Sequence, residues 1–268
     1  MVEVVNVEVV NNEEKLMANK KIFVGLPCYN EEKNIGKLLD SWLDLADDLL
    51  QRGYELVLRP VDDKSSDKTK DILEAYANKY SNIKPIYHKE NKNLGGGLNS
   101  IINTFLANCQ RGDLLAVMDG DYTHLPIFSL SMIDKLACSY DIVIASRYRK
   151  GSEIHGLSKF REMMSIGARI YYSLVLGIKG VRDYTCGYRI YTYEILEEGK
   201  NKYKENLVQN TSFACMMELL YKLYKSGAKI AEVPFVLKYD NKEGESKMNV
   251  GKTSKDSIVS AIKLRLGK

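Results

Sequence analysis

The stretch Leu114-Leu115-Ala116-Val117-Met118-Asp119-Gly120-Asp121 decides the fold of this chain and locates its site. An apolar run that follows Gly112-Asp113 is typical of a buried strand. It ends in two carboxylates one residue apart, and beyond the end of a strand both can face one point. Carboxylates without a basic neighbour repel each other and require a cation, and hard oxygen ligands suit Mg²⁺ or Mn²⁺ completed by substrate phosphates. Taken alone, a solvated Asp-Gly-Asp turn is an equally good interpretation.

Strand and helix patterns alternate on both sides of this run. Predicted strands cover residues 21–26, 54–61, 83–87, 141–146, 187–191 and 229–237. Predicted helices cover residues 31–50, 66–80, 95–107, 126–137, 157–176, 212–225 and 252–266, and 238–250 reads as a polar loop. Such alternation implies an α/β fold with right-handed crossovers, a mostly parallel central sheet and flanking helices. Ligands bind such sheets beyond the carboxyl ends of the strands.

Size and composition narrow the class of protein. The chain has 268 residues, 45% of them hydrophobic, which suffices for one large α/β domain. A net charge of +4 is too mild for nucleic-acid binding but permits contact with an anionic membrane. The five cysteines are too dispersed for a zinc knuckle or a redox pair, so we expect reduced thiols in a cytoplasmic protein. We find no signal-peptide pattern and no run of about 20 apolar residues.

We divide the chain into three parts. Residues 1–20 read as an N-terminal extension, 21–250 as one catalytic domain, and 251–268 as a basic amphipathic helix. The helix over Met163–Gly177 is strongly apolar, and core packing is its favoured interpretation. The alternative is that it lies in a membrane interface and guides a lipid tail to the site. The C-terminal helix equally suits an anionic surface or packing on the domain.

Three loops should meet at the carboxyl edge of the sheet. They are Pro27–Glu31, Asp62–Asp67 and the loop of Asp119 and Asp121. Together they supply an aromatic wall at Tyr29, acceptors at Asp62 and Asp63, and a metal pair, which are the parts that a nucleotide needs. Helix capping is the alternative for Asn30-Glu31 and Ser66-Asp67.

A glycine-rich turn follows, at Asn93-Leu94-Gly95-Gly96-Gly97, just before a predicted helix. The backbone of Asn93 and Gly95 could approach an anionic ligand there. A plain turn is about as good an interpretation, because the segment matches neither a phosphate loop nor the dinucleotide fingerprint. For His124, a hydrogen-bonded structural role is favoured over a ligand role.

Several motifs, taken in order, resemble a known family. LPCYNEE at 26–32, VDDKSSDKT at 61–69, VMDGDYTHLP at 117–126 and IASRY at 144–148 resemble the GT-A fold of family 2 glycosyltransferases, a Rossmann-like nucleotide-diphospho-sugar transferase fold. DYTCGYRIY at 183–191, EVPF at 232–235 and GESKM at 244–248 resemble the dolichyl-phosphate mannose synthases and related polyprenyl-phosphate glycosyltransferases. The resemblance extends from about Lys21 to Met248, and the order and spacing of the motifs make it specific.

The resemblance implies roles for individual residues. Pro27, Tyr29, Glu31 and Asp62 would hold the nucleotide sugar. Asp119 and Asp121 would hold the metal and the diphosphate, and Arg147, Arg161 and Ser165 would contact an acceptor phosphate.

The chemistry of a phosphate acceptor fits this set of residues. A phosphate monoester carries about −1.5 to −2 charge at pH 7, so it is an ionised nucleophile that needs cations rather than a general base. The fork of arginine matches phosphate oxygens, which makes Arg147, Arg161 and Arg189 candidates. We interpret Arg149 as a surface charge.

Two positions depart from the family. Asn241 stands where relatives usually carry an arginine, and Lys242 or Lys247 would have to replace it as a point charge. Thr123 stands where some relatives carry a metal-binding glutamine, so metal coordination would depend more on water.

The main hypothesis is an inverting, metal-dependent glycosyltransferase. It would move mannose or glucose from a nucleoside-diphosphate sugar, GDP-mannose or UDP-glucose, to a polyprenyl phosphate. The enzyme would be peripheral on the cytoplasmic face of a membrane, held by the surface or by a membrane-anchoring partner. The alternative is a GT-A enzyme that acts on a hydroxyl of a soluble glycan or small molecule, with Asp183 or Glu218 as the required base. A third hypothesis is a nucleotide-sugar sensor without catalysis.

Overall fold

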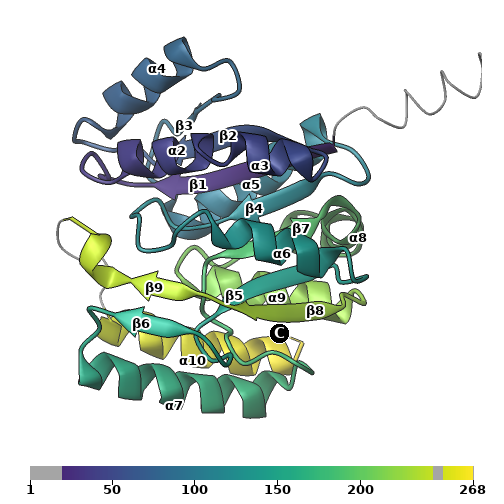
Figure 1. Cartoon of the computed structure of the whole chain (residues 1–268). Helices are drawn as coiled ribbons and strands as arrows, with labels where there is room; N and C mark the ends of the chain where they lie inside the picture. The colour runs from purple at the N-terminus through teal and green to yellow at the C-terminus, as the bar shows by residue number, and fades with distance from the viewer. Residues whose placement is uncertain (1–19, 244–249, 268) are drawn as a thin grey trace, which may run out of the picture.

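A seven-stranded sheet forms the centre of the computed structural model, which describes residues 20–243 and 250–267 (Figure 1). Its strand order is β3-β2-β1-β4-β7-β5-β8. The strands are β1 (Lys20–Cys28), β2 (Tyr54–Asp62), β3 (Ile86–Tyr87), β4 (Leu114–Val117), β5 (Ile142–Ser146), β7 (Arg189–Thr192) and β8 (Ile230–Pro234). β4 and β5 are buried at every residue, as expected for strands covered on both faces. The expected extension over residues 1–20 lies outside the described residues, except for Lys20.

The sheet is parallel apart from one strand. β1 pairs in parallel with β2 and β4, and β5 pairs in parallel with β8. β7 lies antiparallel between β4 and β5, where Arg189 pairs with Val117 on one side and Ile144 on the other. The predicted α/β fold with a mostly parallel sheet is therefore confirmed, and the carboxyl ends of β1, β2, β4 and β5 share one edge.

Helices form where the apolar periodicity predicts them, with two differences, and most of them cover the sheet, whereas α7 and α10 pack on each other. They are α2 (Ile35–Leu43), α3 (Ala46–Gln51), α4 (Thr69–Lys79), α5 (Asn93–Asn108), α6 (Phe128–Leu136), α7 (Lys159–Leu176), α8 (Tyr193–Tyr203), α9 (Ala214–Lys225) and α10 (Val250–Arg265). The single helix expected over 31–50 is two helices, although its predicted apolar face is buried throughout. α8 was not predicted, because few of its residues are apolar and only Ile195, Leu196 and Gly199 are buried.

A small second sheet lies beside the site. The strand predicted over 229–237 is divided at Phe235, and its second half, β9 (Val236–Lys238), leaves the main sheet to pair with β6 (Glu153–His155). A short 3₁₀ turn, η2 (Tyr239–Asn241), follows β9. Below this sheet α7 and α10 run side by side (Figure 1), joined by a hydrogen bond from the Tyr171 hydroxyl to the carbonyl of Ile258 at 2.9 Å.

Candidate active site

The carboxylate pair lies beyond the end of β4, at the carboxyl edge of the sheet. The loop fits closely against its neighbours: a Cβ at Gly120 would lie 2.9 Å from the carbonyl oxygen of Pro27, and a Cβ at Gly187 would lie 3.1 Å from Oδ1 of Asp119. Tyr122, next to Asp121, has a φ of 60°, in the left-handed region that bulky residues rarely adopt. Close packing therefore fixes the backbone on both sides of the two carboxylates.

Electrostatics distinguishes the two acids. Burial, reinforced by the charge of Asp121, raises the pKa of Asp119 to about 7. Burial would also raise the pKa of Asp121, but the nearby ammonium of Lys242 outweighs this effect and the pKa is lowered. Nζ of Lys242 lies 2.8 Å from Oδ2 of Asp121, and the side chains are only 14% and 16% exposed. A cationic group of the protein therefore already lies at the carboxylate pair.

Thr123 orients Asp121 from the other side. Its hydroxyl donates to Oδ1 of Asp121 at 2.7 Å, and its backbone N–H donates to the same oxygen at 3.2 Å. The buried ring of His124 lies 3.2 Å from that hydroxyl and stacks on Phe235. Burial lowers the pKa of His124 to about 4, so the ring is neutral at pH 7. These contacts agree with the favoured structural role of His124.

Arg147 is held by Asp183 in a two-bond ion pair. Nε lies 2.8 Å from Oδ2 and Nη2 lies 2.7 Å from Oδ1, while the backbone N–H of Arg147 also donates to Oδ2. Nη2 donates in addition to the hydroxyl of Thr185 at 2.7 Å. Burial would raise the pKa of Asp183, but Arg147 outweighs it and the pKa is lowered. The guanidinium is therefore fixed before any ligand arrives.

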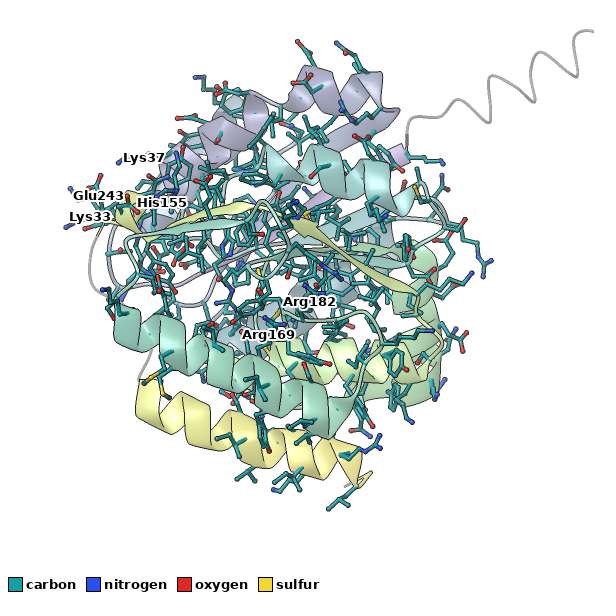
Figure 2. The ribbon with its side chains drawn as sticks, turned by 60° about the horizontal axis from the view of Figure 1, so that its bottom comes forward. Lys33, Lys37, His155, Arg169, Arg182 and Glu243 are labelled. Atoms are coloured by element: carbon teal, nitrogen blue, oxygen red, sulfur yellow. The ribbon has the colours of Figure 1, made fainter. Side chains whose placement is uncertain are left out.

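Tyr148 lies between Arg147 and Ser165, another predicted acceptor residue. Oγ of Ser165 lies 2.5 Å from the Tyr148 hydroxyl, and Arg147 lies over the ring of that tyrosine, 5.6 Å from its centroid. The guanidinium of Arg169 lies over the same ring, 5.0 Å from its centroid, and the sequence analysis did not include this residue in the site. Figure 2 labels Arg169 beside α7. Tyr239 links both halves of the site. Burial raises the pKa of its phenol, which also feels the charges of four predicted residues: Arg147, Asp119, Asp121 and Arg161.

On the nucleotide side, Tyr29 is 42% exposed, and Glu31 and Asp62 are buried. Oε2 of Glu31 accepts from the amide of Asn34 at 2.8 Å. Oδ1 of Asp63 accepts from the backbone N–H of Lys92 at 2.8 Å and lies 2.6 Å from Nδ1 of His88. Asp63 thus holds the loop between β3 and α5.

The first two loops are also tied to each other. Oδ1 of Asn30 accepts from the backbone N–H of Ser66 at 2.7 Å. Oδ1 of Asp67 accepts from the N–H and the hydroxyl of Thr69, at the start of α4. Asp67 precedes Lys68, the N-cap of α4, and binds the first helical residue rather than capping the helix, whereas Asn30 joins two loops of the predicted nucleotide site.

The glycine-rich turn serves packing. The N–H of Gly95 donates to the carbonyl of Thr211 at 3.1 Å, and a Cβ at Gly95 would lie 2.0 Å from the carbonyl oxygen of Asn210. The N–H of Gly95 is therefore engaged within the protein rather than directed at an anionic ligand. Asn93 is exposed at the first position of α5, with a φ of 58°.

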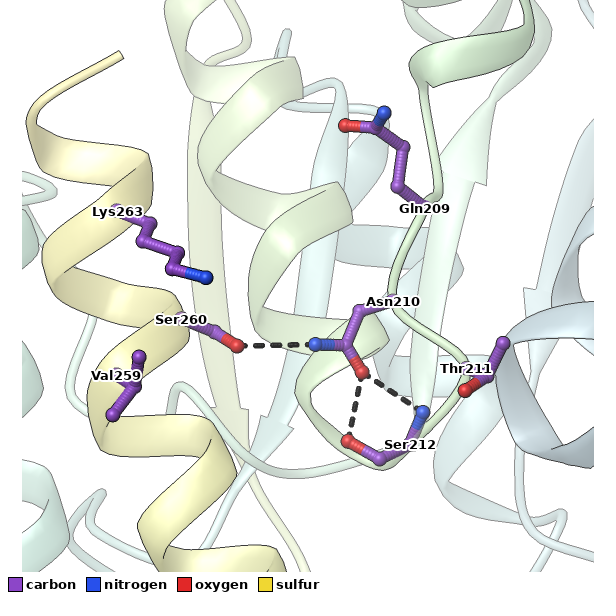
Figure 3. Close-up of a pocket in the computed structure, with 7 residues that line it drawn as sticks. All are labelled: Gln209, Asn210, Thr211, Ser212, Val259, Ser260 and Lys263. Carbon is purple, nitrogen blue, oxygen red and sulfur yellow. Dashed lines mark hydrogen bonds between the residues drawn. The ribbon is translucent and has the colours of Figure 1, made fainter. Parts of the chain in front are cut away.

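The loop on which Gly95 packs also borders a polar pocket on its α10 side (Figure 3). In that pocket the amide of Asn210 donates to the hydroxyl of Ser260 at 3.0 Å. The residues that line it are Gln209, Asn210, Thr211, Ser212, Val259, Ser260 and Lys263, and none of them is a predicted site residue.

The structure contradicts the roles predicted for two arginines, and it does not describe one predicted lysine. Arg189 is fully buried and donates to the carbonyls of Tyr184 and Met216, so its predicted contact with the acceptor phosphate is wrong. Arg149 is not a lone surface charge, because its Nε lies 2.8 Å from Oε2 of the buried Glu232. Lys247 lies outside the described residues.

Both carboxylates considered as a general base are in ion pairs. Asp183 pairs with Arg147 as described. Glu218 pairs with Lys222 at 2.5 Å and accepts the backbone N–H groups of Gln209 and Asn210 at 3.1 and 2.8 Å. Glu218 therefore stabilises the loop before α9 instead of facing the carboxylate pair.

A mostly parallel sheet with a carboxylate pair beyond its carboxyl edge agrees with the GT-A fold expected from the motifs. The profile of glycosyl transferase family 2 matches residues 23–200, and the chain belongs to this family. The family predicted from the motifs is thus confirmed.

Curated relatives are polyprenyl-phosphate enzymes by name. A dolichol-phosphate mannosyltransferase of Pyrococcus furiosus is 32% identical over 234 residues, which are 87% of this chain and 60% of that protein. A dolichyl-phosphate beta-glucosyltransferase of Trichomonas vaginalis is 30% identical over 254 residues, covering 90% of this chain and 73% of that protein. This chain therefore spans about three fifths of the length of the Pyrococcus relative.

Solved structures share the fold. Glucosyl-3-phosphoglycerate synthase from Mycobacterium tuberculosis, solved with Mn²⁺, UDP and phosphoglyceric acid, aligns with a TM-score of 0.66 at 19% identity, covering 95% of this chain and 81% of that one. Mannosyl-3-phosphoglycerate synthase from Rubrobacter xylanophilus aligns with a TM-score of 0.58 at 14% identity, covering 96% and 76%. At these identities the likeness extends to the fold alone.

Proposed function

We propose that this chain is an inverting glycosyltransferase that moves one mannose or glucose from a nucleoside-diphosphate sugar to a polyprenyl phosphate. The names of the Pyrococcus and Trichomonas relatives support the lipid-phosphate acceptor, and they include both sugars. GDP-mannose and UDP-glucose are accordingly the two donors to be tested.

The state of Asp183 and Glu218 carries the proposal. A sugar hydroxyl is not ionised at pH 7 and requires a base to accept its proton, whereas a phosphate monoester is ionised already. Both acids that would serve as that base are bound to cations within the protein. Asp183 instead holds Arg147, and Glu218 holds the loop at residues 209–210. A site without a free base suits a phosphate acceptor, which needs none.

Arg147 is the centre of the proposed acceptor site. Asp183 and Thr185 engage its Nε and Nη2, which leaves Nη1 to meet a phosphate oxygen. Arg161 and Ser165 at the start of α7 complete the site. A guanidinium that is fixed in advance loses little conformational entropy when the phosphate binds.

Asp119 and Asp121 fit a divalent cation. The pair offers only hard carboxylate oxygens, and two carboxylates beside one ammonium leave a net negative charge when both are ionised. Mg²⁺ is commonly held by one or two carboxylates together with substrate phosphates and water. A bound Mg²⁺ or Mn²⁺ would neutralise the diphosphate leaving group. The Mn²⁺ in the mycobacterial synthase supports this assignment.

The α7–α10 surface supports a membrane location. The core-packing interpretation of α7 holds for Tyr172 and Leu176, which are buried, but five large apolar side chains of α7 are exposed. Together with three on α10 and Leu266 directly after it they define the α7–α10 apolar face: Met163, Met164, Ile166, Ile170, Leu174, Ile258, Val259, Ile262 and Leu266. None of the helices in the described part of the chain is long and apolar enough to cross a bilayer. We propose peripheral attachment to the cytoplasmic face of a membrane, directly or through an anchoring partner.

The test is sugar transfer into a lipid extract. Membranes containing polyprenyl phosphate are incubated with the enzyme, Mn²⁺ or Mg²⁺, and radiolabelled GDP-mannose or UDP-glucose, and the label is expected in the organic phase. Arg161→Ala should abolish this transfer, whereas transfer to a hydroxyl of a soluble acceptor should survive the substitution. Label that enters only water-soluble products would overturn the proposal.

A further inference from the structure

Lys242 ties the segment after β9 to the carboxylate pair. Its ammonium lies 2.8 Å from Oδ2 of Asp121, while both N–H and O–H of Thr123 donate to Oδ1. Both oxygens of Asp121 are therefore engaged within the protein. A lysine ammonium is positively charged at pH 7, so this contact is an ion pair between two side chains that are mostly buried.

The next residue anchors the same segment to the nucleotide side of the site. The N–H of Glu243 donates to Oδ1 of Asn34 at 3.0 Å, and the amide of Asn34 donates back to the carbonyl of Glu243 at 3.1 Å. The carboxylate of Glu243 forms an ion pair with Lys37, and Figure 2 shows Lys33, Lys37 and Glu243 together at one edge of the molecule. Asn34 is 2% exposed, so this attachment is well defined.

We propose that Lys242 is a tethered cation that competes with the divalent ion for Asp121, so that ion binding displaces its ammonium from the carboxylate. The inference rests on the proposed metal site. A divalent ion that coordinates Oδ2 of Asp121 must displace the ammonium or lie beside it, and either arrangement costs electrostatic free energy. Lys242 therefore weakens ion binding to the donor-free enzyme.

The same tether gives the ion a second effect. Once displaced, the ammonium remains beside the carboxylate pair, because Glu243 stays attached to Asn34 and Lys37. A donor diphosphate brings negative charge to this place, and the released ammonium pairs with it. The ion and its donor thereby bind together more favourably than the ion alone, and Lys242 supports the departure of the leaving group.

The test measures Mn²⁺ binding to the full chain without nucleotide, followed by electron paramagnetic resonance of the free ion. Lys242→Met is expected to bind Mn²⁺ on the order of tenfold more tightly than the wild type. Lys242→Arg keeps the cation and should resemble the wild type. Lys84→Met, which removes the same charge from an exposed residue outside the site, is the matched control and should change nothing.

A second measurement separates competition from a loosened segment. Lys37→Met removes the ion pair with Glu243 but keeps Lys242, and it should raise Mn²⁺ affinity less than Lys242→Met does. Circular dichroism checks that each variant is folded. With saturating Mn²⁺, Lys242→Met should bind the ion more tightly yet transfer sugar more slowly, a combination that a merely structural lysine would not give.

The contrary results are equally defined. The proposed competition is wrong if Lys242→Met binds Mn²⁺ with the same affinity as the wild type. It is also wrong if neither protein binds Mn²⁺. The proposed transferase function fails separately, if the wild type moves no sugar to polyprenyl phosphate.

Discussion

The guanidinium of Arg147 and the carboxylate of Asp183 form an ion pair that is fixed by a second ion pair behind it. Asp183 is fully buried, and its backbone N–H donates to Oε1 of Glu232 at 2.7 Å. The other oxygen of Glu232 pairs with Arg149 at 2.8 Å. Two arginines of one loop are therefore held by two acids of other segments, which explains how an arginine at the rim of the site keeps one orientation.

Arg147→Ala should destabilise the protein as well as abolish transfer. The substitution leaves Asp183 charged and unpaired in the interior, which typically costs about 3–5 kcal/mol. Arg147→Lys keeps the charge but loses the fork, and should lower the rate of lipid-phosphate glycosylation about 10²-fold with a smaller loss of stability. Urea unfolding and the transfer assay measure the two effects. Equal transfer rates for Lys and Arg at this position would show that the fork does not contact the acceptor.

The carboxylate pair should make the metal-free protein less stable as the pH rises. The folded-state pKa of Asp119 is raised from 3.8 to about 7, because of burial and the charge of Asp121. A carboxyl with a raised pKa favours the folded state while it is protonated, so its contribution is lost between about pH 4 and pH 7. Mn²⁺ needs the ionised form, and the rise in melting temperature on adding Mn²⁺ should therefore be larger at pH 8 than at pH 6. Asp119→Asn should abolish the rise, and a rise that persists in this variant would place the ion elsewhere.

Gly187→Ala should weaken metal binding without unfolding the chain. The added Cβ would lie 3.1 and 3.2 Å from the two oxygens of Asp119, which must shift by a few tenths of an ångström. We expect Mn²⁺ affinity to fall about tenfold, as for other groups that orient a metal ligand.

Gly167→Ala on α7 is the matched control, because a Cβ there meets no heavy atom within 4 Å. It should stabilise the protein by about 0.5–1 kcal/mol and leave Mn²⁺ binding unchanged. If Gly187→Ala binds Mn²⁺ as the wild type does, Asp119 is not a ligand of the ion.

Local patterns predicted most of the architecture. The apolar run before Asp119 and the alternating elements were sufficient for a parallel sheet, since strand ends and helix faces follow from sequence periodicity. The antiparallel insertion of β7 was not predictable, because strand order depends on contacts between distant segments. The division of 229–237 at Phe235 was missed for the same reason: β9 forms by pairing with β6, a three-residue strand with little signal of its own.

The candidate site was predictable in its residue types but not in its pairings. Nothing in the sequence distinguishes Arg147 from Arg189. Arg147 lies in the site, whereas Arg189 is buried in the core and donates its hydrogen bonds to backbone carbonyls. Asp183 was considered as a base, and only the fold shows that it belongs to Arg147. The link from Lys242 to Asp121 joins positions 121 residues apart, and no local pattern could reveal it.

The α7–α10 apolar face should govern membrane attachment. Leu174 is 81% exposed and Ile170 is 55% exposed, and each buried CH₂ group contributes about 0.8 kcal/mol to binding at an interface. Replacing both with glutamate removes apolar area and adds charge that an anionic surface repels. We expect wild-type protein to float with vesicles that contain anionic lipid in a density gradient, and Ile170→Glu/Leu174→Glu to stay in the soluble fraction.

The double variant should still show a Mn²⁺-dependent rise in melting temperature, because neither residue contacts the carboxylate pair. Lys84→Glu makes the same change of two negative charges at an exposed residue away from this face, and this control should float like the wild type. Flotation of the double variant would assign attachment to another surface of the protein, because purified vesicles contain no anchoring partner.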